Sequence, residues 1–266
     1  MVVVNDSVFV SIVMAAYNEE AHIAEAIESI KFQTYQNWEL IIVDDCSIDN
    51  TVEIIKSYIK DDSRIRLIRN FENLGLAACL NRAIEDSKFD LIARADADDI
   101  NLPERLRRQV IFLNSNPEVD VLGTGAWLLD FSRQRIRSVS LSLSHEELRC
   151  LPFLKTHFFH SSVVIRKHFF KKYGYYDSSY RRAQDKELWL RGLELGAVYA
   201  NLHEPLIEYA TNNYIRSWKS IFMSKKTLLS IGRKYKVKYY LFYVLIILVK
   251  QVLIKLRLWR SKALKY

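Results

Sequence analysis

Residues 91–99 read Leu-Ile-Ala-Arg-Ala-Asp-Ala-Asp-Asp, a mostly apolar run that ends in three carboxylates within four residues. The run Leu91–Ala95 predicts a buried strand, because it is short and dominated by apolar residues. Three carboxylates in one loop repel one another unless a cation or a network of hydrogen-bond donors offsets their charge. The stretch therefore predicts a strand whose carboxyl end carries a site for a cationic partner.

Strand-like and helix-like patterns alternate around this stretch. Strands are predicted at 8–15, 39–43, 64–68 and 91–95, and helices at 17–30, 51–59, 75–84 and 103–114. Asn18 is the expected N-cap of the first helix, with acidic residues in its first turn. Apolar strands alternating with amphipathic helices imply a mostly parallel sheet covered on both faces, and the fold class is α/β.

The pattern is mixed beyond residue 115. Strands are expected at 119–122, 126–131 and 162–165, and helices at 146–151, 167–173 and 184–195. Gly123-Thr124-Gly125 separates the first two of these strands. Because no Gly/Ser-rich or Pro-rich linker interrupts residues 1–208, they are expected to form one compact domain. Residues 209–266 are helix-prone and amphipathic, and form a second region, a basic tail.

Charge is distributed unevenly along the 266 residues. No Asp or Glu follows Glu208, whereas 14 Lys and Arg lie between Arg216 and Lys265. Subtracting these 14 charges from the net charge of +8 leaves −6 for residues 1–208. An acidic body does not coat a polyphosphate backbone, so no nucleic-acid partner is expected. The longest apolar run, Tyr239–Val249, has 11 residues, and a membrane-spanning helix needs about 20.

The three cysteines, Cys46, Cys79 and Cys150, are an odd number and form no CxxC pair. This arrangement argues against a disulfide framework and a zinc site, and favours a reducing compartment. No basic segment followed by an apolar segment opens the chain, so an ordinary signal peptide is not expected.

A second acidic cluster lies at another strand end, where Asp44 and Asp45 follow the strand 39–43. Ligands of open α/β sheets bind outside the carboxyl ends of the strands. A single loop carboxylate is most often solvated or caps a helix, but two clusters at strand ends favour a site. Carboxylate oxygens select Mg²⁺ or Mn²⁺, ions that commonly bridge to substrate phosphates. Since neither a Walker loop nor GxGxxG is present, a nucleotide would be held in another manner.

Seven stretches follow one another in the order of a known family. They are Val10–Glu19 (VSIVMAAYNE), Ile42–Thr51 (IVDDCSIDNT), Asn73–Ala77 (NLGLA), Ile92–Asp99 (IARADADD), Leu102–Leu106 (LPERL), His160–Ser162 (HSS) and Gln184–Arg191 (QDKELWLR). Together they resemble the family 2 inverting glycosyltransferases of GT-A fold, in particular bacterial enzymes that build surface polysaccharides. The resemblance covers roughly residues 8–210 and implies a Rossmann-like sheet flanked by helices.

The resemblance implies a nucleotide-binding region with seven members: Ala16, Tyr17, Glu19, Asp44, Asp45, Asn73 and Gly75. Asp96 and Asp98 match the family's DXD element, with Asp98 the direct ligand of Mn²⁺ or Mg²⁺ that bridges to the donor diphosphate. Tyr17 could instead be a core aromatic residue, and Asp99 could cap the next turn.

Asp185 matches the family's catalytic base, although Gln184 stands where the family has Glu. A positioned carboxylate activates an acceptor hydroxyl by taking its proton. The alternative is a structural role, in which Asp185 lies at the N-terminus of the helix and accepts hydrogen bonds from its free N–H groups. Arg191 is either an orienting ion-pair partner, a phosphate contact or a surface residue. His160 either lines the acceptor side or is a structural histidine. The family's Arg and His near the diphosphate have no counterpart in Ala210–Asn213.

The sequence thus predicts a metal-dependent inverting glycosyltransferase that takes a sugar from a nucleoside-diphosphate donor, expected to be UDP-linked, to a glycan or lipid-linked acceptor. The alternatives are a sugar nucleotidylyltransferase, which normally has a Gly-rich basic loop after its first strand, and a non-catalytic glycan-assembly protein. The basic, aromatic tail favours an anionic membrane surface, so the expected location is cytoplasmic and peripheral at the inner face of the plasma membrane. The sugar, acceptor, linkage position and oligomeric state stay open.

Overall fold

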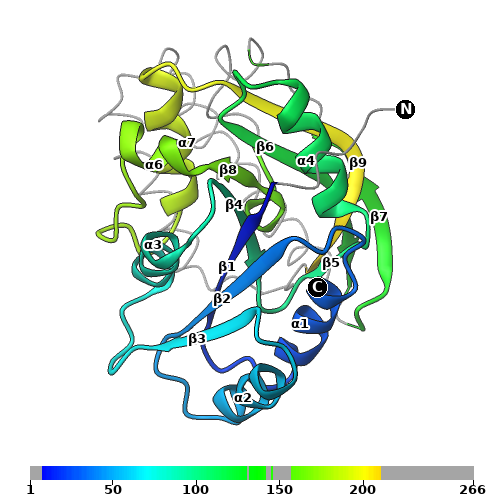
Figure 1. The fold of residues 1–266 in the computed structure, drawn as a ribbon, viewed down its shortest axis with the longest axis vertical. Helices are drawn as coiled ribbons and strands as arrows, with labels where there is room; N and C mark the ends of the chain where they lie inside the picture. The colour runs from blue at the N-terminus through cyan, green and yellow to red at the C-terminus, as the bar shows by residue number, and fades with distance from the viewer. Residues whose placement is uncertain (1–7, 131, 142–144, 146–156, 211–266) are drawn as a thin grey trace, which may run out of the picture.

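The computed structural model describes residues 8–130, 132–141, 145 and 157–210 (Figure 1). The strands are β1 (Val10–Ala16), β2 (Trp38–Asp44), β3 (Ile65–Arg69), β4 (Leu91–Asp96), β5 (Ile100–Asn101), β6 (Val121–Leu129), β7 (Arg135–Val139), β8 (Val164–Arg166) and β9 (Tyr199–Ala210). The helices are α1 (Ile23–Lys31), α2 (Thr51–Asp61), α3 (Leu76–Asp86), α4 (Arg105–Ser115), α6 (Lys167–Tyr173), α7 (Gln184–Glu194) and the 3-10 helix η1 (His160–Ser162). The predicted α/β class is confirmed.

The described strands form one sheet in the order β3-β2-β1-β4-β8-β6-β9-β5, with β7 paired to β6. Strands β3, β2, β1 and β4 are parallel, as the strand–helix alternation predicts. Strand β8 is antiparallel to both β4 and β6, whereas β9 runs parallel to β6. The mixed half explains why the pattern beyond residue 115 lacks regular alternation.

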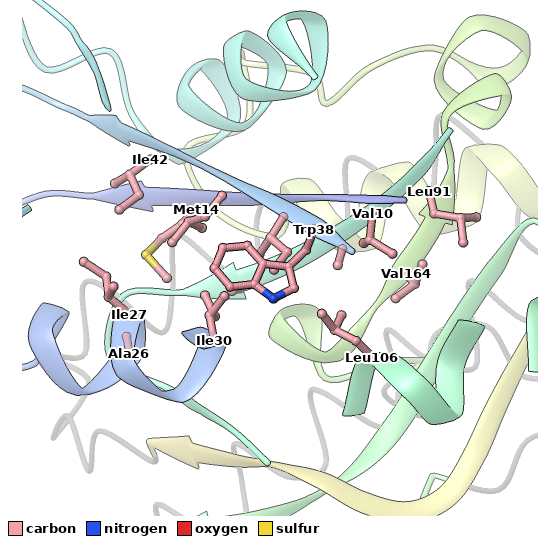
Figure 2. Close-up of a cluster of buried hydrophobic side chains, with 14 of the residues drawn as sticks. Val10, Met14, Ala26, Ile27, Ile30, Trp38, Ile42, Leu91, Leu106 and Val164 are labelled. Atoms are coloured by element: carbon pink, nitrogen blue, oxygen red, sulfur yellow. The ribbon is translucent and has the colours of Figure 1, made fainter. Parts of the chain in front are cut away.

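Alternate residues of the parallel strands enter two cores, one on each face of the sheet. Helices α1, α2 and α4 cover one face, and α3, α6 and α7 cover the other (Figure 1). Figure 2 shows the first core, where Trp38 lies among Met14, Ile30 and Leu106. The indole is 2% exposed, and the Arg64 guanidinium lies 3.7 Å from its ring centroid. Burial on both faces fixes the strands and therefore the positions of their carboxyl ends.

The first helix begins later than the sequence suggests, which corrects the expected N-cap at Asn18. Helix α1 begins at Ile23 after the N-cap position His22, and Asn18 has a φ of 55°. The three N–H groups of residues 18–20 donate to Ser47 Oγ at 3.0 Å, Thr51 Oγ1 at 2.7 Å and Asp49 Oδ2 at 3.1 Å. Because side chains of loop 47–51 accept hydrogen bonds from these N–H groups, residues 18–20 are held in a loop that precedes the helix.

Gly123 and Gly125 lie inside one strand and do not end it, so the two strands expected at 119–122 and 126–131 are one element, β6. A Cβ on Gly125 would lie 2.9 Å from the carbonyl oxygens of both Val139 and His203. The glycines thus permit close approach of neighbouring strands, with register shifts against β9 on either side of Gly125.

Strands β5, β7 and β9 had no sequence prediction, and β9 includes Tyr209 and Ala210, which were expected in the tail. The helix predicted at 146–151 and the tail from residue 211 onward lie outside the described residues. In the part of the chain that the structure describes, no helix combines the length and apolar character needed to cross a membrane.

Candidate active site

The parallel register aligns the predicted site residues at one edge of the sheet. Ala16 pairs with Asp44 on β2, and Ala15 pairs with Asp96 on β4. The carboxyl ends of three neighbouring strands therefore lie side by side. Both acidic clusters that the sequence marks are brought to this edge, as expected for parallel strands.

The loop after β1 is held against the loop after β2. In addition to the bonds from residues 18–20, Asn18 Oδ1 accepts the Ile48 N–H at 2.9 Å, and Glu20 accepts the Asn50 N–H at 3.0 Å. Tyr17 is 46% exposed between these anchored residues. The exposure removes the alternative that Tyr17 is a core aromatic residue.

Asp45 holds the loop that precedes α3. Its carboxylate accepts Asn70 Nδ2 at 2.8 Å and the N–H groups of Leu74 and Gly75 at 2.9 and 2.8 Å. Burial alone would raise the pKa of Asp45, but these hydrogen bonds outweigh it and hold the pKa below its usual value. Gly75, with a φ of 88°, adopts a backbone conformation that favours glycine.

Asp44 is fully buried beside Asp45, and its carboxylate accepts the Ser47 N–H at 3.3 Å. Arg69 Nε lies 3.5 Å from the same carboxylate. Asn73 is exposed, and its Nδ2 lies 3.5 Å from the Asp45 carbonyl. The structure thus brings Asp44, Asp45, Asn73 and Gly75 together, with the two acids bonded within the protein and Asn73 open to solvent.

Three carboxylates cluster at the end of β4. One oxygen from each of Asp96, Asp98 and Asp99 lies within 4.8 Å of the others. Asp99 is 2% exposed, and its Oδ1 accepts the Ala210 N–H at 2.7 Å while Oδ2 has no hydrogen-bond partner among the described residues. Asp99 therefore binds β9 and does not cap a turn.

Mutual repulsion marks this cluster. Burial and the charge of Asp96 raise the pKa of Asp98, and burial with Asp96 and Asp98 raises that of Asp99. Burial, followed by the charges of Asp98 and Asp96, raises the pKa of Glu19 to about 7. Oxygen-only donors under mutual repulsion fit Mg²⁺ or Mn²⁺.

Arg133, which the sequence did not single out, links this cluster to α1. Its Nη1 donates to the Asp98 carbonyl at 3.0 Å, and its Nε lies 3.2 Å from Glu25 Oε2. It precedes β7 and has a φ of 58°. Only tertiary structure brings it to the site, so no sequence signal could have identified it.

Asp185 lies in the first turn of α7, next to Ala183, which has a φ of 58°. Leu188 and Trp189 are buried and fix the helix. Burial raises the pKa of Asp185, while the Lys186 N–H and the positive charges of Arg94 and Lys186 oppose the rise. A partly exposed carboxylate with a raised pKa is suited to accept a proton.

Two tyrosines connect Asp185 with the acidic cluster. Burial raises the pKa values of Tyr176 and Tyr209, and the charges of both Asp96 and Asp185 add to each rise. Both hydroxyls therefore lie within electrostatic range of Asp96 and of Asp185.

Arg191 forms an ion pair, as one of the predicted alternatives has it, while a phosphate contact stays a prediction. Its Nη2 lies 2.9 Å from the fully buried Glu187, and it donates to the carbonyls of Tyr173 and Tyr175. These bonds tie α7 to the segment that follows α6.

His160 also has protein partners. Its Nε2 lies 2.8 Å from Tyr176 Oη, and its ring packs against Trp189. Burial holds the pKa of His160 well below its usual value, so the ring is neutral. This bonding favours the structural alternative for His160.

A parallel sheet with a cluster of carboxylates at the carboxyl ends of its strands is an α/β architecture with a candidate active site at that edge. Comparison with known proteins gives the family of the chain. The family model for glycosyl transferase family 2 matches residues 11–174. The chain belongs to this family and is a glycosyltransferase with the GT-A fold.

Two relatives and two solved structures illustrate the similarity. EpsE of Bacillus subtilis (strain 168), named as a glycosyltransferase, is 40% identical over 200 residues, covering 74% of this chain and 71% of EpsE. The O-antigen biosynthesis glycosyltransferase WbnJ of Escherichia coli is 31% identical over 209 residues, covering 77% and 80%.

The S. aureus TarS structure with UDP has a TM-score of 0.66 at 18% identity and covers 84% of this chain. This chain spans 65% of that structure, just under two thirds of its length. The mannosyltransferase PcManGT of Pyrobaculum calidifontis, in complex with GDP-Man and Mn²⁺, has a TM-score of 0.62 at 16% identity, covering 85% of this chain and 63% of PcManGT. At such identities the two structures support the fold alone.

Asp45→Asn should lower the free energy of unfolding by about 2–3 kcal/mol at pH 7, because hydrogen bonds to a charged group are lost. The native pKa is lowered, so the stabilisation is complete above the unfolded value of about 3.9 and is lost as pH falls through the native value. Denaturant unfolding should show a constant gap from about pH 7 to 5 that narrows below about pH 4. The exposed Glu85→Gln is the control, and a gap that widens in acid would contradict this role.

Proposed function

We propose that the protein is a metal-dependent inverting glycosyltransferase that transfers a sugar from a UDP-sugar to a glycan or lipid-linked oligosaccharide in surface polysaccharide biosynthesis. The observation that carries the proposal is the close grouping of Asp96, Asp98 and Asp99 at the strand edge, and the electrostatic coupling of Tyr176 and Tyr209 to both Asp96 and Asp185 supports it. Asp96, proposed to help hold the metal, and Asp185, proposed as the base, would then lie on two sides of one reaction centre. UDP-bound TarS and the amylovoran biosynthesis glycosyltransferase AmsE of Erwinia amylovora support the donor and the pathway class.

Asp96 and Asp98, together with Asp99, would hold Mn²⁺ or Mg²⁺ at the end of β4. The observation that favours this fit is the close grouping of three carboxylates, two of which have raised pKa values. When bound, such an ion offsets the charge of a diphosphate leaving group. Arg133 fixes the backbone of Asp98 for this purpose.

The donor nucleotide would lie along the edge formed by β1 and β2. The exposed side chains Tyr17 and Asn73 are the proposed contacts for base and ribose, with Glu19 and the Ala16 backbone beside them. Asp44 and Asp45 take part by holding loops 47–51 and 70–75 in position.

Asp185 is the proposed general base. The acceptor hydroxyl attacks the anomeric carbon from the face opposite the diphosphate, a new C–O bond forms, and the bond to the diphosphate oxygen breaks. The hydroxyl proton moves to a carboxylate oxygen of Asp185, and UDP leaves with the electron pair. Burial raises the proton affinity of Asp185, and α7 keeps its position fixed.

We further propose that residues 211–266 bind an anionic membrane surface and hold the enzyme at the inner face of the plasma membrane. The support is the tail's 14 basic residues without an acid, together with the aromatic residues Trp259 and Tyr239. This location would give a soluble donor and a lipid-linked acceptor access to the same enzyme.

Two single substitutions test the roles of the carboxylates. Asp98→Ala should abolish Mn²⁺-dependent UDP binding, because it removes the proposed direct ligand. Asp185→Asn should keep UDP binding but lower transfer about 10²–10⁴-fold, the usual contribution of a general base. Calorimetry with UDP and an assay of UDP release from UDP-sugars measure the two effects.

Each variant is the control for the other. Full activity of the wild type in excess EDTA would contradict metal dependence, and equal losses of UDP affinity and rate in Asp185→Asn would make Asp185 a binding or structural residue. Release of pyrophosphate from a nucleoside triphosphate would support the nucleotidylyltransferase alternative.

Membrane binding is tested with vesicles of anionic and of neutral lipids. The full chain should sediment with anionic vesicles at low salt, since each basic residue near the surface contributes about 1 kcal/mol. Replacing Lys250, Lys255, Arg257, Arg260 and Lys262 by Gln should release it without changing UDP binding. Equal sedimentation of both proteins would contradict the membrane proposal.

A further inference from the structure

Arg94 is a buried cation within β4, two residues before the acidic cluster. It is 2% exposed and lies on the same face of the strand as Asp96, because residues two apart on a strand share a face. Its backbone is fixed on both sides, since its N–H donates to the Val163 carbonyl and its carbonyl accepts Arg105 Nη2. The position of the guanidinium is thus set by the sheet.

Only part of the hydrogen-bonding capacity of the Arg94 guanidinium is used. Nη2 forms an ion pair with Asp96 Oδ1, whereas the buried Nε and Nη1 have no hydrogen-bond partner among the described residues. Buried N–H groups of an arginine are costly when left without partners. A charge held in this state indicates a role beyond the Asp96 pair.

Several titratable groups lie within electrostatic range of Arg94, on β4, η1, α7, β9 and the segment after α6. They are Asp96, Asp98, Asp99, Asp185, His160, Tyr176 and Tyr209. The other buried guanidinium nearby, Arg105, is bonded to Gln109, Asn101 and two carbonyls. Lys186 is the cation that faces Asp185 from α7 itself.

We propose that Arg94 is a positioning residue that acts between the two functional carboxylates. It occupies Asp96 Oδ1, so that Asp98, Asp99 and the second oxygen of Asp96 are left for the metal, and it places a positive charge within electrostatic range of Asp185. The inference rests on the proposed function and adds a residue to it.

Arg94 acts on the two carboxylates in different ways. Burial raises the pKa of Asp185, and the positive charge of Arg94 opposes that rise. A protonated Asp185 cannot act as a base. Arg94 also competes with a metal ion for Asp96 through their ion pair, so its loss should slow proton transfer without weakening metal binding.

The test compares wild type with Arg94→Met, Arg94→Lys and Arg66→Met. Arg66, on β3, is a matched control that pairs with Glu39 and Asp86 at the opposite end of the strands. Three quantities are measured: kcat for UDP release, its pH profile, and the Kd of Mn²⁺ in the presence of UDP from the electron paramagnetic resonance signal of free Mn²⁺.

Arg94→Met should lower kcat about 10–100-fold, the scale of outer residues at metal sites. The Mn²⁺ Kd should be unchanged or lower, and the acid limb of kcat should move to higher pH because Asp185 loses a positive neighbour. Arg94→Lys should restore part of both kcat and the acid limb, while Arg66→Met should leave all three quantities unchanged. Thermal unfolding of each variant checks that it is folded.

A Mn²⁺ Kd that rises in proportion to the loss of kcat would overturn the inference and make Arg94 a structural support of the metal site. Unchanged kcat in Arg94→Met would also overturn it. If Arg94→Met does not fold, the test uses Arg94→Lys, and the measured quantity is the position of the acid limb in the pH profile of kcat. A wild type that neither binds UDP with Mn²⁺ nor transfers sugar would refute the proposed function itself, and the role of Arg94 with it.

Discussion

The parallel pairing of β1 with β2 and β4 is the constraint on which the site depends. It aligns Ala16 with Asp44, and Ala15 with Asp96, so that three loops begin at one edge of the sheet. The pairing is fixed by apolar residues on both faces of each strand: Met14 and Trp38 lie in one core, shown in Figure 2, and Val13 and Ile41 lie in the other. Hydrophobic burial thus places the polar chemistry without contributing a polar group.

Concentrating acids at one edge creates an electrostatic cost, which the fold offsets in different ways. Three hydrogen-bond donors from the loop before α3 stabilise the charged form of Asp45, so this carboxyl group stays ionised. At Asp98 and Asp99, burial and the charges of neighbouring acids outweigh the opposing charge of Arg94 and the hydrogen bond from the Ala210 N–H, and the pKa values are raised. Acids of the same type therefore serve different purposes, with Asp45 organising a loop and the β4 cluster suited to a divalent cation.

The sequence predicts the parallel half of the fold well, because its strands are short apolar runs and its helices have clear periodicity. It also predicts the acids, since carboxylates that follow buried strands must meet at one edge. The mixed half was harder to predict: β6 contains two glycines that read as a break, although they allow close strand packing.

Some residues of the site could not be predicted either, because only the tertiary structure brings them to it. Arg133 reaches Asp98 only through the turn before β7, and Arg191 satisfies backbone carbonyls that no local pattern reveals. Arg94 was not singled out from the sequence either, although a charged residue within an apolar strand, two positions before Asp96, is a signal that could have identified it.

The central claim is that Asp185 accepts the acceptor proton on the face opposite the diphosphate held at the β4 cluster. The anomeric configuration of the product, measured by NMR from an α-linked UDP-sugar that the wild type uses, tests it most directly. A β linkage is expected, because attack from the Asp185 side inverts the anomeric carbon. An α linkage would contradict it, since retention requires either a covalent intermediate or attack from the face of the departing diphosphate.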